Sequence, residues 1–262
     1  MHLFFRFGSL AIPSYGLMIA LGVVLANVVA MFVLRKTKLD LNDFILTEAY
    51  CILGAFIGAK GLYLIVSARE IQWDQMLNLS YFNQIMQGGF VFYGGLIGGL
   101  LFVCLSGKLH KIGTGVYVRN FIFLIPFIHA FGRVGCFLAG CCYGRPYEGI
   151  GAVVFPEGSY APAGIKLFPV QLVEAVVLLG IALLLLFLQM EKNWYYTIES
   201  YFLLYAVARF VLEYFRYDEV RGRFLYLSTS QWISIVLASI AVASIYRNKL
   251  QTKRGEGLCQ NS

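Results

Sequence analysis

Charged side chains are scarce in this chain of 262 residues. Asp, Glu, Lys and Arg together make up 13% of it, whereas hydrophobic residues make up 59%. A water-soluble domain carries about a quarter charged residues, because its surface must meet water. The composition therefore excludes an ordinary water-soluble domain and predicts that much of the apolar surface faces lipid.

The six cysteines lack the spacing of a small secreted domain that is held together by disulfides. Cys136, Cys141 and Cys142 lie close in the sequence, which leaves metal or redox chemistry as an alternative. A structural zinc site takes four ligands, and His129 is the only further candidate nearby in the sequence. We therefore favour a packing or turn role for these thiols, so the sequence predicts no metal and no cofactor. On this interpretation, changing Cys141 and Cys142 to Ser is tolerated.

Charge is absent from two long stretches, residues 7–34 and 224–246, which hold 28 and 23 residues. About 20 apolar residues cross a bilayer as a helix, and a helix satisfies its own backbone hydrogen bonds inside hydrocarbon. The sequence therefore predicts an all-α integral membrane protein, with a single polytopic domain over residues 1–262. We place about seven transmembrane helices, at residues 11–34, 43–66, 89–106, 116–132, 169–190, 197–215 and 228–246.

Two stretches between these helices differ in composition. Residues 67–87 mix polar side chains with Trp, Tyr and Phe, which favours a segment lying in the membrane interface. Residues 133–168 hold three of the six prolines and many glycines. The sequence therefore predicts that residues 133–168 form a non-helical active region.

The distribution of Lys and Arg gives an orientation, because cytoplasmic loops carry an excess of basic residues. One side of the predicted bundle holds eleven: Arg35, Lys36, Lys38, Lys108, Lys111, Arg119, Lys192, Arg247, Lys249, Lys253 and Arg254. The other side holds seven: Arg6, Arg69, Arg145, Lys166, Arg216, Arg221 and Arg223. The richer side is predicted to be cytoplasmic, which places the N-terminus outside and the C-terminus inside.

Three further cations fall within or at the outer end of predicted helices: Lys60, Arg133 and Arg209. A Lys or Arg at the centre of a transmembrane helix costs about 2.5–3.5 kcal/mol on insertion scales, so each needs a reason to be there. In the orientation above, all three lie in the outer half of the bilayer. Arg145 and Arg216 are predicted just above them.

Two interpretations of these cations remain open. In the first, they reach the nearest headgroups and form ion pairs with Glu174 and Glu213. In the second, they line a cavity that binds an anionic headgroup, because a guanidinium offers a fixed fork of donors that matches a phosphate. Helical spacing favours the second, since polar residues recur on one helix face at Tyr205, Arg209, Glu213 and Arg216, with Glu213 orienting Arg209. Gln171 and Glu174 share a face in the same way.

Glycines recur at intervals of four in the second and third predicted helices, at Gly54 and Gly58 and at Gly94 and Gly98. Small residues at this spacing let helix backbones approach closely. The pattern predicts close packing of these two helices beside Tyr93.

Residues 129–145 begin with His-Ala-Phe-Gly-Arg-Val-Gly and end with Gly144 and Arg145. This stretch resembles the glycine- and arginine-rich signature of the prolipoprotein diacylglyceryl transferases of bacterial cytoplasmic membranes. Five further stretches resemble other motifs of that family in the same order, at residues 14–18, 58–61, 88–98, 169–174 and 205–216. The resemblance covers most of the chain.

The resemblance implies a transferase that acts in lipoprotein maturation in the bacterial inner membrane. The donor would be phosphatidylglycerol, and the acceptor would be the cysteine thiol in a prolipoprotein signal peptide. The product would be a thioether that carries diacylglycerol, with glycerol phosphate leaving. No nucleic acid is expected as a partner.

Site residues follow from the matched motifs and from the charges described above. The residues expected in the chemistry are Arg133, Arg209 and Tyr93. The residues expected to bind substrate are Tyr15, Lys60, Gly144, Arg145, Gln171, Glu174, Tyr205, Glu213 and Arg216. The arginines would stabilise the charge that develops on the leaving phosphate.

The sequence departs from the family's pattern at several positions. Tyr93 stands where the family has a histidine, and a phenol with a pKa of about 10 is expected to donate a hydrogen bond rather than act as a strong base. Cys136 replaces an asparagine, and Cys141 replaces a glutamate. Phe168 stands where the family has a histidine before a proline. Without a strong base at position 93, the positive electrostatic potential of the arginines is expected to contribute more to deprotonation of the acceptor thiol.

Two other functions remain open at this point. A divergent relative would use another acceptor, or thiol chemistry of its own. A transporter or lipid-binding protein without catalysis would also carry charges inside the membrane. That second alternative is disfavoured, because the charges gather toward one leaflet and the sequence shows no inverted repeat.

Overall fold

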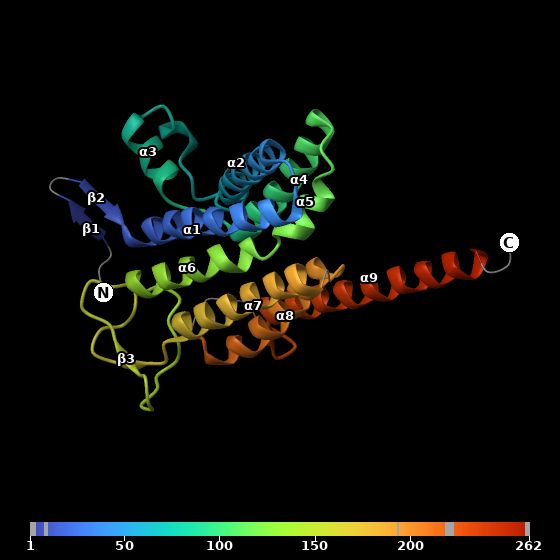
Figure 1. The fold of residues 1–262 in the computed structure, drawn as a ribbon. Coiled ribbons are helices and arrows are strands. Elements are labelled where there is room, and N and C mark those ends of the chain that lie inside the picture. Colours follow the sequence, from blue (N-terminus) through green and yellow to red (C-terminus); the bar gives the residue numbers. More distant parts are fainter. Residues whose placement is uncertain (1–3, 8–9, 193, 218–222, 260–262) are drawn as a thin grey trace. The chain divides into compact units, whose positions relative to one another are not determined.

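The computed structural model describes residues 4–7, 10–192, 194–217 and 223–259, so Arg221 of the outer basic set lies outside the described residues. The chain is mainly helical in these ranges (Figure 1), as the sequence predicts. Its contacts divide it into two compact units, one formed by Met1–Val33 with Arg119–Ser262 and the other by Leu34–Val118.

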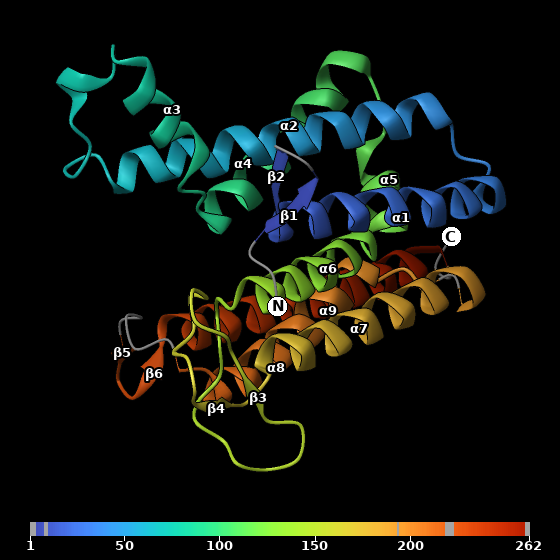
Figure 2. The ribbon, with the colours of Figure 1, turned by 90° about the vertical axis from the view of Figure 1, so that its left-hand side faces the viewer.

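The first unit is built on a row of packed helices. α6 (Leu124–Ala139) packs against α7 (Val170–Lys192), α7 against α8 (Thr197–Leu212), and α8 against α9 (Thr229–Cys259). Figure 2 shows α6, α7, α8 and α9 side by side. A small apolar core of Ala130, Ala175 and Leu178 joins α6 to α7, and Tyr205 of α8 packs against it.

α1 (Ser14–Thr37) begins in the first unit after a hairpin of β1 (Phe4–Phe7) and β2 (Leu10–Pro13). It packs along α6 through glycines. A Cβ placed on Gly22 would lie 2.8 Å from the Cβ of Phe131, and one on Gly135 would lie 3.0 Å from the Cα of Tyr15. Residue 15 is therefore held beside the last turns of α6.

The segment between α6 and α7 carries a core of its own. It contains the hairpin of β3 (Val153–Val154) and β4 (Lys166–Leu167). Phe155, Ala161 and Leu167 are buried together there, and Phe137 of α6 packs against them. This core fixes the non-helical segment to the end of α6.

The second unit is organised around α2 (Leu41–Val66) and α4 (Phe92–His110), with η1 (Trp73–Gln75) and α3 (Leu79–Gln87) between them. A Cβ on Gly58 would collide with the carbonyl oxygen of Gly94, and one on Gly54 with that of Gly98. The predicted close packing of these two helices through glycine is therefore confirmed.

The remaining elements are short. α5 (Thr114–Phe121) precedes α6 with a bend of 49° between them. η2 (Glu213–Phe215) continues the chain after α8, and the hairpin of β5 (Arg223–Phe224) and β6 (Leu227–Ser228) leads into α9.

Five described helices, α1, α2, α4, α7 and α9, are long and apolar enough to cross a membrane, and the bent pair of α5 and α6 would make a sixth. These apolar helices bear out the prediction of a multi-pass membrane protein. α8 and η2 together cover the predicted helix at residues 197–215, but α8 itself has only 16 residues.

One predicted boundary is wrong. The sequence predicts that the fourth helix ends at residue 132 and that a non-helical region begins with Arg133. The structure continues α6 through Ala139 and ends it at Gly140, which adopts a left-handed conformation with φ of 76°. The helix passes through Arg133 because that charge has partners on neighbouring elements.

Candidate functional site

Three arginines and two glutamates of the first unit form a buried cluster, which we call the arginine cluster: Arg133, Arg209, Arg216, Glu174 and Glu213. The Nε of Arg133 lies 3.1 Å from Oε1 of Glu174. The Nη1 of Arg216 lies 3.5 Å from Oε2 of the same carboxylate. Glu174 is 2% exposed, so the carboxylate that bridges these two guanidinium groups lies inside the protein.

Arg209 occupies the other part of the arginine cluster. Its Nη2 lies 2.8 Å from Oε2 of Glu213, one turn further along the chain. The same nitrogen donates a hydrogen bond to Oγ of Ser230 on α9, at 3.1 Å. This geometry confirms the predicted pairing of Arg209 with Glu213.

The charges of the arginine cluster do not cancel, because three guanidinium groups face two carboxylates. One positive charge is left in excess within a buried setting. In addition, Nη1 of Arg209 is buried and has no hydrogen-bond partner among the described residues. A buried donor without a partner is costly, so the site is suited to an anion that accepts from it.

His129 belongs to the same site, although it was not among the site residues predicted from the sequence. Its Nε2 lies 3.2 Å from Nε of Arg133, four residues along α6. The imidazole ring lies 5.8 Å from the ring of Tyr205. The i, i+4 spacing of His129 and Arg133 was the available sequence signal.

The residues after α6 tie the loop to the helices that carry the arginine cluster. The backbone N–H of Arg145 donates to the carbonyl of Phe215 at 3.0 Å, and that of Phe168 donates to the carbonyl of Arg145 at 3.0 Å. A Cβ on Gly144 would collide with the carbonyl of Phe168. The chain therefore needs glycine at position 144 to run between the start of α7 and the end of α8.

The other predicted residues of the first unit also surround this site. The guanidinium of Arg145 lies 5.2 Å from the ring centre of Phe215. Gln171, buried in the first turn of α7, donates from Nε2 to the carbonyl of Cys141 at 2.8 Å. The side chain of Tyr15 is 45% exposed, although its Cα packs on α6. Part of this residue is therefore accessible to a ligand.

Two predicted site residues, Lys60 and Tyr93, belong to the second unit. The ammonium of Lys60 donates to the backbone carbonyls of Ile85, Gly88 and Gly89, and it lies 4.8 Å from the ring centre of Phe90. Lys60 thus holds the segment between α3 and α4. Tyr93 lies in the first turn of α4 with 42% of its side chain exposed.

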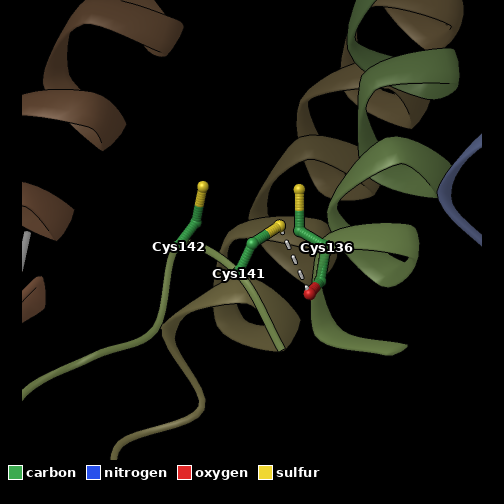
Figure 3. A group of neighbouring side chains, drawn as sticks. All are labelled: Cys136, Cys141 and Cys142. Carbon is green, nitrogen blue, oxygen red and sulfur yellow. Dashed lines mark hydrogen bonds between the residues drawn. The ribbon is translucent and has the colours of Figure 1, made fainter. Parts of the chain in front are cut away.

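The three cysteines at the end of α6 form a second group (Figure 3), which we call the thiol cluster. The Sγ atoms of Cys136, Cys141 and Cys142 all lie within 4.8 Å of one another. Cys136 is buried and the other two are partly buried. Hydrogen bonds from the Cys136 and Cys141 thiols, together with nearby Arg216 and Arg133, hold the pKa of the Cys142 thiol well below its ordinary value.

Ser230 is a further residue of the site that was not predicted from the sequence. It lies at the start of α9, in a predicted apolar helix that carries several serines, and nothing in the sequence distinguishes it from Ser234 or Ser239. Only the packing of α8 against α9 brings its hydroxyl to Arg209.

Comparison with known proteins supports the family resemblance found in the sequence. A sequence model described as prolipoprotein diacylglyceryl transferase matches residues 2–247. Phosphatidylglycerol–prolipoprotein diacylglyceryl transferase 2 of Clostridium perfringens is 33% identical over 252 residues, which cover 95% of this chain and 96% of the relative. The corresponding transferase of Clostridium tetani is 35% identical over 251 residues, with 94% and 98% covered. That of Pasteurella multocida is 32% identical over 225 residues, with 81% and 77% covered.

Proposed function

The chain belongs to the prolipoprotein diacylglyceryl transferase family, and from this premise we propose that it transfers the diacylglyceryl group of phosphatidylglycerol to the cysteine thiol of a prolipoprotein signal peptide. This is the first step of lipoprotein maturation. The family match over residues 2–247 confirms the resemblance predicted from six motifs. It disfavours a non-catalytic transporter, because the relatives above are named as transferases.

The observation that carries the proposal is the uncompensated positive charge of the arginine cluster. Phosphatidylglycerol carries one negative charge on its phosphodiester, which equals the excess left by three guanidinium groups and two carboxylates. The buried Nη1 of Arg209 supplies a donor for a phosphate oxygen. Lipid binding would therefore neutralise the cluster and satisfy this donor together.

The same charges suit the chemistry of transfer. When the bond between the glyceryl carbon and the phosphate oxygen breaks, negative charge develops on the leaving glycerol phosphate. Arg133 and Arg209 would stabilise that charge, while Glu174 and Glu213 hold their guanidinium groups in place. Preorganised donors of this kind are worth about 10²–10³ in kcat each.

The other residues would bind and position the substrates. Arg145 and Tyr15 are exposed enough to reach the glycerol headgroup or the signal peptide. Gly144, Gln171, Tyr205 and Arg216 would shape and hold the site. Lys60 would order the segment that leads into α4, and Tyr93 would donate a hydrogen bond to a substrate.

Membrane topology follows from the same proposal. We place the seven predicted helices across the bacterial cytoplasmic membrane as one polytopic domain, with the N-terminus outside and the C-terminus in the cytoplasm. α8 with η2 supplies the seventh helix, and the 16 residues of α8 reach about 24 Å at 1.5 Å per residue. The arginine cluster would then face the outer leaflet, where signal peptides present their cysteine.

The direct test is to incubate the purified protein in proteoliposomes with phosphatidylglycerol and a peptide that contains the signal-peptide cysteine. We expect mass spectrometry to show a diacylglyceryl adduct on that cysteine. A peptide with Ser in place of the cysteine is the control for acceptor chemistry. Absence of the adduct, while a relative works in parallel, would show that the acceptor or the reaction has changed.

A further inference from the structure

The thiol cluster has the geometry of a metal site with three ligands. In a tetrahedral zinc–thiolate site, with zinc–sulfur bonds of about 2.3 Å, the sulfur atoms are about 3.8 Å apart. The Sγ atoms of Cys136, Cys141 and Cys142 already lie within 4.8 Å of one another. Small side-chain rotations would therefore bring all three into bonding distance of one ion.

The backbone after α6 is arranged so that these thiols meet (Figure 3). Gly140 turns the chain with φ of 76°, and the N–H of Cys141 then donates to the carbonyl of Cys136 at 3.0 Å. Cys142 itself has φ of 56°, a conformation that is uncommon for residues other than glycine. Gln171 holds the carbonyl of Cys141 from α7. A strained residue is thus kept in place by contacts on both sides, which is typical of functional sites.

We propose that Cys136, Cys141 and Cys142 bind a zinc ion whose fourth position takes the acceptor cysteine thiol as a thiolate. This role replaces the packing or turn role expected from the sequence, and changing Cys141 and Cys142 to Ser should then slow transfer. Three protein ligands with one open position are the pattern of catalytic zinc, whereas structural zinc is closed by four. Among the described residues, these three cysteines are the group that offers such ligands.

The surroundings favour such an ion. A zinc ion would cancel two of the three thiolate charges, and Arg133 and Arg216 lie near the thiols. Arg133 and Cys136 are three residues apart on α6, so they share a helix face. The zinc-bound acceptor would therefore sit beside the arginines that hold the lipid phosphate.

The inference rests on the proposed transfer and supplies the thiolate that the transfer needs. The acceptor thiol binds zinc and releases its proton to water, because a coordinating thiol is deprotonated. Its sulfur then attacks the glyceryl carbon that carries the phosphate. A carbon–sulfur bond forms, the carbon–oxygen bond breaks, and glycerol phosphate leaves with the electron pair. Zinc stays in the +2 oxidation state throughout.

The first test is the metal content of the full chain, purified in detergent and dialysed against buffer with trace zinc. We expect one zinc per chain by mass spectrometry of the elements, and none in the variant with Cys136→Ser, Cys141→Ser and Cys142→Ser. The matched control is Cys104→Ser, because Cys104 is an exposed cysteine of α4. Wild-type protein without zinc, or a triple variant that keeps it, would overturn the proposal.

The second test asks whether the acceptor cysteine binds the fourth position of the metal ion. After zinc is replaced by cobalt(II), we expect the near-ultraviolet thiolate-to-cobalt absorption to grow when the acceptor peptide is added, and not when its cysteine is replaced by Ser. An unchanged spectrum would show that the acceptor does not bind the metal. This measurement uses wild-type protein, so it does not depend on whether the triple variant folds.

The outcomes separate this inference from the proposed function. If the adduct forms but no zinc is bound, the transferase stands and the zinc site is wrong. If zinc and peptide bind but no adduct forms, the transfer is wrong and the site remains. If both hold, removing zinc with a chelator should slow transfer by about 10²–10⁴-fold, the usual contribution of an acid–base group, and adding zinc should restore it.

Discussion

The helices of the two units are held together by different kinds of contact. In the second unit, α2 and α4 meet backbone to backbone at Gly58 and Gly94, and the cation Lys60 is satisfied by carbonyl groups. In the first unit, α6, α7 and α8 meet around the arginine cluster. Glycine contacts hold helices together at little cost in desolvation. Buried charges are costly. The first unit holds a cluster of five of them, and this concentration supports the proposal that the chemistry takes place there.

The largest expected effect on stability comes from Glu174→Gln. The change leaves Arg133 and Arg216 without the carboxylate that bridges them. Removing one partner of a buried pair costs about 3–5 kcal/mol. We expect a markedly lower midpoint of thermal unfolding in detergent.

The matched control for that change is Glu199→Gln in α8. Glu199 accepts a hydrogen bond from Ser244 at 2.9 Å, and a neutral amide oxygen still accepts it, so we expect a loss of at most about 1 kcal/mol. Equal losses for the two variants would contradict the role assigned to Glu174.

The largest expected effect on catalysis comes from Arg209→Ala, which removes the donors that we propose for the lipid phosphate. We expect the transfer rate to fall by about 10²–10³-fold. Arg209→Lys keeps the positive charge but loses the fixed set of guanidinium N–H donors. Its rate should therefore lie between that of Arg209→Ala and that of the wild type. The measurement is adduct formation per minute at saturating phosphatidylglycerol.

The control is Arg69→Ala, since Arg69 is an exposed arginine of the second unit. It should transfer at the wild-type rate. An active Arg209→Ala variant would remove the arginine cluster from the mechanism.

A moderate effect is expected where the second unit depends on close backbone contact. Gly58→Ala places a Cβ against the carbonyl of Gly94, and such overpacking costs about 1–3 kcal/mol. Gly61→Ala on the same helix is the control, because its Cβ would meet nothing within 4 Å. Thermal unfolding should separate the two variants, and equal stability would show that α2 and α4 tolerate a wider spacing.

The smallest expected effect is that of Ser230→Ala. It removes the hydrogen bond of 3.1 Å from Arg209 and leaves the ion pair with Glu213 intact. We expect a loss of about 0.5–1.5 kcal/mol in the free energy of unfolding. Ser239→Ala, whose hydroxyl bonds only its own helix at Ile235, should cost less. A reversed order would show that Ser230 does not support Arg209.

The sequence predicted the parts of this structure that depend on helical periodicity. The spacing of Arg209 and Glu213 predicted their pairing, and the glycines of α2 and α4 predicted the contact between those helices. Both patterns are local, because residues four apart share a helix face. They can therefore be read from the sequence of one helix at a time.

The parts that failed depend on contacts between segments far apart in the sequence. α6 runs past Arg133 because Glu174 of α7 neutralises part of its charge, and one helix's sequence does not show that partner. The meeting of Cys136 with Cys142 depends on left-handed backbone at Gly140 and Cys142. Cys142 is neither Gly nor Asn, so its conformation gives no sequence signal.

The hydrogen bonds that join the loop between α6 and α7 to the chain after α8 have a consequence for motion. The N–H of Arg145 bonds Phe215, that of Phe168 bonds Arg145, and that of Tyr217 bonds Tyr143 at 3.3 Å. These three hydrogen bonds lie next to one another, so breaking one of them strains the other two. The three amides should exchange with solvent deuterium as one cooperative unit. The loop that carries Cys141 and Cys142 and the chain that carries Arg216 would then open and close together.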